Sequence, residues 1–219
     1  TTLFRSEPPK PQAEVILVAK NSPLKSVADL KGKKVAFQKG SSSHNLLLRA
    51  LQREGLSFKD IQPIYLTPAD ARAAFQQGDV DAWAIWDPYY SAALQQGNVR
   101  VLADGSQLNL TGSFYLATRK FAEQNGAFVQ QVLDTFSQAD ALTLSQRDQS
   151  IDLLAAAMGL PKPVIASYLD HRPPTRISPV SAQTAAAQQH TADLFYSSHL
   201  VPVKLTIADR IWHPSAQLQ

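Results

Sequence analysis

Short apolar runs alternate with polar segments that contain glycine or proline along the first half of the chain. The runs cover residues 13–19, 35–37, 61–66, 82–86 and 99–102. Apolar runs of this length, bounded by turn-forming residues, predict buried β-strands. The first half of the chain therefore has the pattern of a sheet.

The segments between these runs carry helix-start signals. Serines at 41–43 precede apolar residues at helical spacing, residues 67–70 (Thr-Pro-Ala-Asp) form a capping-box pattern, and Asp87-Pro88 begins a further helix. Strands that alternate with helices at this spacing predict parallel βαβ units, with helices on both faces of the sheet. Residues 39–45 and 86–89 would then meet at the carboxyl edge of the sheet, where ligands usually bind.

The pattern changes at about Gly112. Residues 113–117 predict one more strand, and apolar residues then repeat at helical spacing. The helices expected here cover residues 129–136, 145–159, 164–169 and 182–196. The change predicts two parts, one with α/β alternation and one that is mostly helical.

The composition narrows the classes of function. The 219 residues carry a net charge of only +3, and the basic residues are scattered, which argues against a nucleic-acid partner. The absence of cysteine excludes disulfides, thiolate metal ligands and a cysteine nucleophile. The histidines lack metal-ligand spacing, and no apolar run is long enough to cross a bilayer. We therefore expect no metal and no direct membrane insertion.

The segment from Gly40 to Asn45 is the best candidate for a binding site. A strand, a Gly/Ser turn and a helix opening leave several backbone N–H groups directed one way, which favours an anionic oxygen group. An ordinary N-capped helix without a ligand explains the same residues. Adjacent Ser and His also suggest a hydrolase, but the Gly-x-Ser-x-Gly elbow is absent.

Aromatic residues gather at the end of the run at 82–86. Trp83 and Trp86 are three residues apart, so in a regular strand they face opposite ways. One of them could line a cleft, and Trp86 is favoured because it stands at the strand end. Asp87 is a better candidate for a helix cap than for a ligand-binding carboxylate.

From Glu7 to about Pro214 the chain closely resembles the aliphatic sulfonate-binding proteins of bacterial sulfonate ABC transporters. Asp-Leu-Lys-Gly-Lys at 29–33 is typical of the wider class of periplasmic binding proteins. Gly-Ser-Ser-Ser-His-Asn at 40–45 and Trp-Asp-Pro-Tyr at 86–89 narrow the resemblance to the sulfonate, taurine and nitrate branch. The other segments that carry the resemblance are residues 7–11, 112–116 and 168–174.

The resemblance implies a monomeric, periplasmic solute receptor with the α/β, type II periplasmic-binding-protein fold. Such a protein captures alkanesulfonates between two lobes and delivers them to an ABC permease for sulfur acquisition, without a cofactor and without catalysis. Serines and a histidine would cradle the sulfonate, and an aromatic and an acidic residue would form the cleft wall. The residues implied are Ser41, Ser42, Ser43, His44, Trp86 and Asp87.

The chain departs from the family at its beginning. Family members carry a βαβ portion of lobe one before the proline-rich connector, and neither this portion nor a signal peptide is present. We expect an incomplete lobe one that exposes apolar surface and binds sulfonate weakly or aggregates. The expected division is a non-family leader and connector at 1–11, partial lobe one at 12–32 and 111–219, and complete lobe two at 33–110.

The same fold family includes proteins with other ligands and other functions. Taurine and nitrate are alternative ligands. A thiamine-pyrimidine synthase-like enzyme is a different class, but that branch carries a cysteine-rich iron-binding segment and this chain has no cysteine. A ligand-sensing regulator would carry a helix-turn-helix, and none precedes Glu7.

Overall fold

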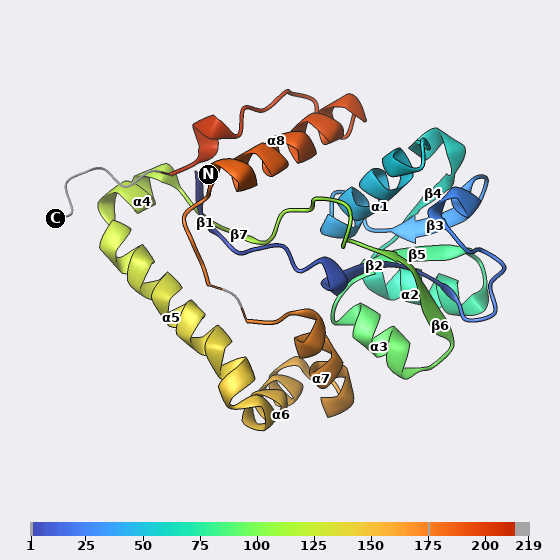
Figure 1. Cartoon of the computed structure of the whole chain (residues 1–219), viewed down its shortest axis with the longest axis horizontal. Coiled ribbons are helices and arrows are strands. Elements are labelled where there is room, and N and C mark those ends of the chain that lie inside the picture. The colour runs from blue at the N-terminus through green and yellow to red at the C-terminus, as the bar shows by residue number, and fades with distance from the viewer. Residues whose placement is uncertain (1, 175, 213–219) are drawn as a thin grey trace. The chain divides into compact units, whose positions relative to one another are not determined.

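The computed structural model describes residues 2–174 and 176–212 of the chain (Figure 1). The chain forms two compact units, which we call the α/β unit and the helical unit. The α/β unit contains residues 10–109 and 151–172, and the helical unit contains residues 1–9, 110–150 and 173–219. Residues 213–219, the end of the expected lobe-one range, lie outside the described residues.

A five-stranded sheet in the order β4-β3-β5-β2-β6 forms the α/β unit. Every strand predicted in the first half of the chain is present, with ends shifted by no more than two residues. The strands are β2 (Glu14–Ala19), β3 (Lys34–Phe37), β4 (Gln62–Tyr65), β5 (Ala82–Trp86) and β6 (Val99–Asp104). The predicted α/β class is therefore confirmed.

The direction of one strand differs from the prediction. β3 pairs in parallel with β4 and β5, whereas β2 is antiparallel to both of its neighbours, β5 and β6. A helical crossover sets strands parallel, and β2 is followed by only a short 3-10 turn, η2 (Val27–Leu30). The alternation of strands and helices therefore predicts direction correctly only for the strands that a helix joins.

Helices cover both faces of this sheet (Figure 1). On one face, Leu17, Ala36 and Trp83 pack with Ala71 of α2 and Ala93 of α3. α1 lies over the other face and contacts β2 and β5. The helical segments of this unit are α1 (Ser42–Arg53), α2 (Pro68–Gln77), α3 (Tyr89–Gln95), α7 (Lys162–His171), η1 (Pro11–Ala13) and η3 (Phe58–Asp60).

Local sequence explains where these helices begin and end. The Thr67 hydroxyl accepts a hydrogen bond from the Asp70 N–H at 3.3 Å, and Pro68 occupies the first helical position of α2. Gly78 ends α2 in the left-handed conformation, with φ at 81°. The helix start predicted from the Thr-Pro-Ala-Asp pattern is confirmed.

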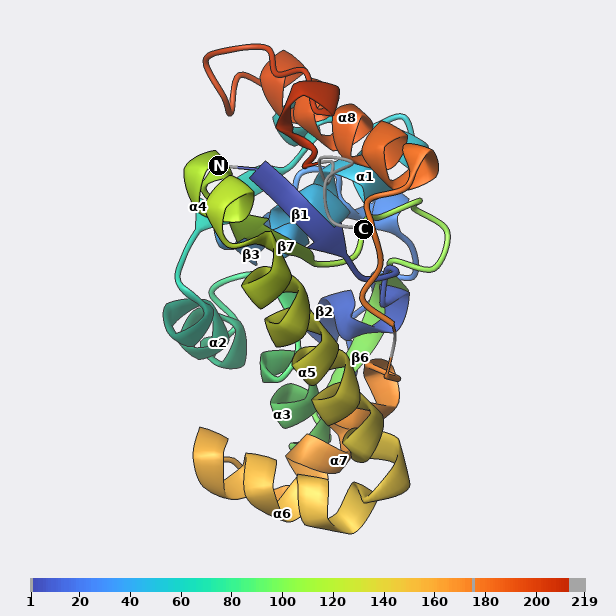
Figure 2. The ribbon, with the colours of Figure 1, turned by 90° about the vertical axis from the view of Figure 1, so that its left-hand side faces the viewer.

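The helical unit is organised around a two-stranded antiparallel sheet of β1 (Thr2–Ser6) and β7 (Phe114–Ala117) (Figure 2). Buried Ala122 and Leu133 pack with Tyr115, Val129 and Trp212. Its helical segments are α4 (Arg119–Gln124), α5 (Gly126–Ser145), α8 (Ala182–Ser197) and η4 (Ala208–Arg210). The boundary between the units passes through α6 (Arg147–Met158).

The structure groups the chain differently from the expected division. The sequence places residues 12–32 in lobe one, but β2 lies in the same sheet as β3 and β5. Residues 151–172 also belong to the α/β unit. Residues 2–6, expected to be part of a non-family leader, form β1 and pair with β7. Each difference depends on pairing between residues far apart in the chain, which a local pattern does not reveal.

Gly112 marks a close approach between two backbone segments of the helical unit. A Cβ atom on Gly112 would overlap the carbonyl oxygens of Glu7 and Pro8. We expect Gly112→Ala to lower the free energy of unfolding by more than about 2 kcal/mol, because backbone atoms would have to move. Urea denaturation of this variant beside Ser113→Ala, which changes an exposed neighbour, tests the expectation. Equal stability of the two variants would contradict it.

Candidate functional site

One edge of the five-stranded sheet brings the predicted site residues together. β3 and β5 are parallel, so the turn after Phe37 and the corner after Trp86 leave the sheet at the same edge. β2 runs the other way and starts at this edge, where Glu14 is the register partner of Trp86. The prediction that residues 39–45 and 86–89 lie at one edge of the sheet is confirmed. Glu14 lies at the same edge and is an additional candidate site residue.

The turn between β3 and α1 is fixed by its own hydrogen bonds. Gly40 has a left-handed backbone, with φ at 78°, and its N–H donates to Nδ1 of His44 at 3.0 Å. The Ser41 hydroxyl accepts from the His44 N–H at 3.2 Å and donates to the Gln38 carbonyl at 2.7 Å. Its oxygen also lies 2.9 Å from the Ser43 hydroxyl. The side chains of Ser41, Ser43 and His44 therefore stabilise the turn itself.

Of the four residues at 41–44 that were expected to bind the sulfonate, Ser42 is the one that faces solvent. Ser43 and His44 are fully buried, Ser41 is half-buried, and Ser42 is exposed. The hydroxyl of Ser42 interacts with the carboxyl group of Glu14. The exposed first residue of α1 offers its hydroxyl and backbone N–H to a ligand, in the positive field of the helix N-terminus.

Aromatic rings enclose His44. Its ring centroid lies 4.8 Å from that of Phe37, 5.1 Å from that of Phe58 and 6.5 Å from that of Tyr65. Burial, with a smaller contribution from Lys39, lowers the pKa of His44 from its usual 6.5 to about 4. His44 is therefore neutral near pH 7, as a hydrogen-bond acceptor at Nδ1 must be.

Glu14 was not indicated by the sequence, because it lies within the otherwise apolar run at 13–19. Burial raises the pKa of its carboxyl group, and the hydrogen bond from Ser42 and the charge of Arg172 offset part of that rise. A carboxyl group beside the N-terminus of α1 shapes the charge that a ligand meets there. The sequence shows only that Glu14 stands near the start of a strand. Placing it beside Trp86 requires knowing that β2 is antiparallel to β5.

Trp86 and Asp87 differ in their availability to a ligand. Trp86 is half-buried; it packs against the same core cluster as Trp83, and its ring centroid lies 6.0 Å from that of Tyr89. Asp87 is only 4% exposed. Trp86 can form part of a site wall, whereas a ligand cannot reach Asp87 in this structure.

Both oxygens of Asp87 are used within the α/β unit. Oδ1 accepts from the Ser91 N–H at 2.9 Å and from the Ser91 hydroxyl at 2.5 Å. Oδ2 lies 2.8 Å from Nδ1 of His171, whose ring stacks on Tyr90 at 4.8 Å. The Ser91 hydroxyl also lies 3.2 Å from that of Ser167. This group holds α7 against the start of α3. Pro88 is the N-cap residue of α3, and Asp87, one residue earlier, accepts the Ser91 N–H in the first turn of the helix.

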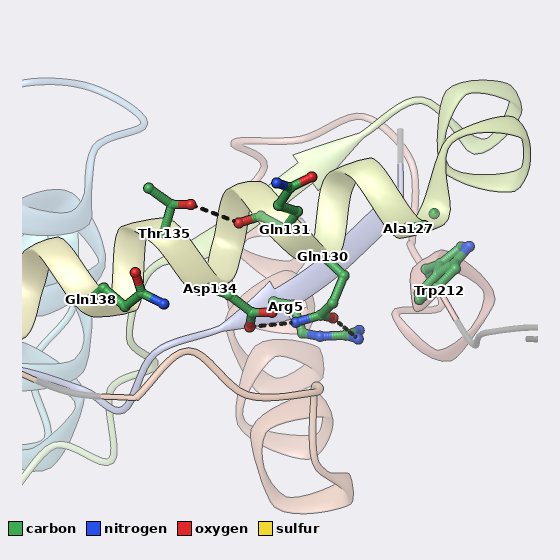
Figure 3. A pocket seen from close by; sticks show the side chains of 9 residues that line it. Arg5, Ala127, Gln130, Gln131, Asp134, Thr135, Gln138 and Trp212 are labelled. Atoms are coloured by element: carbon green, nitrogen blue, oxygen red, sulfur yellow. Dashed lines mark hydrogen bonds between the residues drawn. The ribbon is translucent and has the colours of Figure 1, made fainter. Parts of the chain in front are cut away.

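A second candidate is a cavity of about 700 Å³ in the helical unit (Figure 3). Arg5 donates to Oε1 of Gln130 at 2.8 Å, and its guanidinium lies 5.5 Å from the Trp212 ring centroid. Burial lowers the pKa of Arg5, and Asp134 offsets part of that effect. Among the described residues that line the cavity, Asp134 alone is acidic, so it lacks a carboxylate pair for acid–base chemistry.

Metal and membrane sites receive no support from the described structure. Within residues 2–174 and 176–212, no group of three or more His, Asp or Glu side chains is placed to hold a metal ion. The helices of the same residues are too short or too polar to cross a bilayer.

The lowered pKa of His44 makes stability depend on pH. Between about pH 6.5 and 4 the unfolded chain binds a proton at His44 that the folded chain does not. The free energy of unfolding therefore falls as the pH is lowered through this window, by about 3 kcal/mol in total. Urea denaturation at pH 7 and pH 4.5 should show a larger loss for the wild type than for His44→Phe. Equal losses would contradict this assignment.

A structural role for Asp87 predicts a loss of stability when its side chain is removed. Asp87→Ala leaves the Ser91 hydroxyl and His171 Nδ1 without their acceptor, so we expect unfolding to require about 3 kcal/mol less. Asp79→Ala, at an exposed carboxylate, is the matched control. If Asp87→Ala is as stable as the control but no longer binds ligand, Asp87 is a ligand residue instead.

The comparisons with known proteins agree on one family. The family model described as NMT1/THI5 like matches residues 10–150. A curated protein of Escherichia coli (strain K12), described as an aliphatic sulfonates-binding protein, is 77% identical over 209 residues. That match covers 95% of this chain and 66% of the relative, so the chain spans just under two thirds of the relative's length.

Two solved structures are similar over nearly the whole of this chain. The periplasmic aliphatic sulphonate binding protein SsuA from Escherichia coli has a TM-score of 0.96 and 74% identity, covering 100% of this chain and 70% of that chain. The alkanesulfonate-binding protein SsuA from Xanthomonas axonopodis pv. citri, bound to MOPS, has a TM-score of 0.90 and 54% identity. That match covers 96% of this chain and 73% of the Xanthomonas chain. The expected resemblance and fold are thereby confirmed, and this chain belongs to the NMT1/THI5-like family.

Proposed function

We propose that this protein is the solute-binding component of an ABC importer that captures alkanesulfonates in the periplasm and delivers them to a membrane permease. The observation that carries the proposal is the 74% identity to a sulfonate-binding protein whose structure superposes on all of this chain with a TM-score of 0.96. On this proposal the protein acts as a monomer and catalyses no reaction.

The chemistry at the start of α1 supports an anionic ligand. A sulfonate carries one charge over three acceptor oxygens, and Ser42 offers a hydroxyl and a backbone N–H at an exposed helix N-terminus. Half-buried Trp86 stands at the same sheet edge and suits an alkyl tail. The Xanthomonas relative is bound to MOPS, which is itself a sulfonate.

The proposal gives the predicted site residues different tasks. Ser42 contacts the sulfonate directly, and Trp86 forms a wall of the site. Ser41, Ser43 and His44 hold the turn that carries Ser42. Asp87 fixes the corner after Trp86 through its bonds to α3 and α7.

Glu14 favours one alternative ligand. Its carboxyl group interacts with the Ser42 hydroxyl and would lie close to a bound ligand. A sulfonate that also carries an ammonium group, as taurine does, could pair its cation with this carboxylate. Taurine is therefore the second candidate, and nitrate, which has neither a tail nor a cation, is the third.

Calorimetry on the whole protein, as its host expresses it, tests the function. The panel contains methanesulfonate, pentanesulfonate, taurine, nitrate and sulfate. We expect the alkanesulfonates to bind more tightly than nitrate and sulfate. Binding of nitrate alone, or of taurine alone, would reassign the ligand, and no binding of any member would refute the proposal.

Ser42→Ala tests the site within the same assay. Loss of one hydrogen bond to a charged ligand should weaken sulfonate binding about tenfold. Ser106→Ala, at another exposed serine, is the matched control. Wild-type affinity in Ser42→Ala would place the sulfonate elsewhere.

A further inference from the structure

His44 is the most enclosed polar side chain at the proposed site. It is fully buried, so a ligand at Ser42 does not reach its ring in this structure. Its Nδ1 accepts the N–H of Gly40, four residues earlier, at 3.0 Å. A side chain of the helix thus bonds back to the turn that leads into that helix.

The position of this acceptor is determined by several elements. Phe37 ends β3, Phe58 belongs to η3 and Tyr65 ends β4, and all three rings lie within 6.5 Å of the His44 ring centroid. Phe37 also stacks on Phe58 at 5.5 Å, and meets Tyr65 edge-on at 5.1 Å. The imidazole therefore has little freedom to rotate, and Nδ1 stays directed at Gly40.

The backbone conformation of Gly40 sets the course of the turn. Its left-handed backbone, with φ at 78°, reverses the chain between β3 and α1. The next residue, Ser41, caps α1 by accepting the His44 N–H at 3.2 Å. His44 therefore contacts the turn twice, through its ring at Gly40 and through its backbone at Ser41.

We propose that His44 is a positioning residue for ligand binding, which holds Gly40 and Ser41 so that Ser42 faces the ligand, and does not touch the ligand itself. The proposal rests on the sulfonate site proposed above. It requires the neutral tautomer with the proton on Nε2, since Nδ1 is an acceptor. The ammonium of Lys39 lies 5.6 Å from the Tyr65 ring centroid, and its charge disfavours a second positive charge on His44.

Two variants distinguish the contribution of the hydrogen-bond acceptor of His44 from that of its ring. His44→Asn retains an oxygen near the position of Nδ1 but removes the ring, whereas His44→Phe retains a ring but removes the acceptor. We expect His44→Phe to speed hydrogen exchange of the Gly40 amide at least tenfold and to weaken sulfonate binding about tenfold. His44→Asn should stay within about threefold of the wild type in both measurements, even though it loses ring packing.

The opposite ordering would overturn the proposal. If affinity follows thermal stability across both variants, or if His44→Phe keeps wild-type exchange at Gly40, His44 only packs the core. Phe58→Leu disturbs the same rings without removing the acceptor, and we expect it to keep the slow exchange at Gly40.

A measurement on the wild type is independent of whether the variants fold. Nitrogen NMR of the His44 ring should show the Nε2–H tautomer, with Nδ1 unprotonated, and the Nδ1–H tautomer would refute the proposal. If the wild type binds no sulfonate, the proposed function fails, while the tautomer and the Gly40 exchange still decide the role of His44.

Discussion

The parallel pairing of β3 with β5 is the constraint on which the candidate site depends. Because the two strands run the same way, the turn after Phe37 and the corner after Trp86 leave the sheet at one edge. Antiparallel β2 adds Glu14 to that edge. Reversing either β3 or β5 would move its loop to the opposite edge, and the same residues would no longer form a common site.

Internal hydrogen bonds make this site rigid before any ligand arrives. The hydroxyls of Ser41 and Ser43, the ring of His44 and the carboxylate of Asp87 all bond to neighbouring protein groups. Such bonds lower the entropy that binding would otherwise have to remove. A polar motif can therefore act mainly by holding its own backbone, with few of its side chains reaching the ligand.

Much of the fold was visible in local patterns. The runs that predict strands and the Thr67 cap depend on residues within one or two turns of each other, and both are confirmed. Strand β1 and the antiparallel direction of β2 were not predicted. β1 pairs with β7 more than a hundred residues later, and such pairing leaves no mark on the local sequence.

The sequence by itself determined the α/β class, the family and the segment Gly40–Asn45 as the candidate site. Only the tertiary structure decided which members of that segment face solvent. Ser42 and Ser43 are adjacent residues of the same type at the start of α1, yet Ser42 is exposed and Ser43 is fully buried. The same holds for His44 and Asp87, whose partners Phe58 and His171 come from distant segments. Burial and hydrogen-bond partners depend on which distant elements pack together, and that information appears only when the chain has folded.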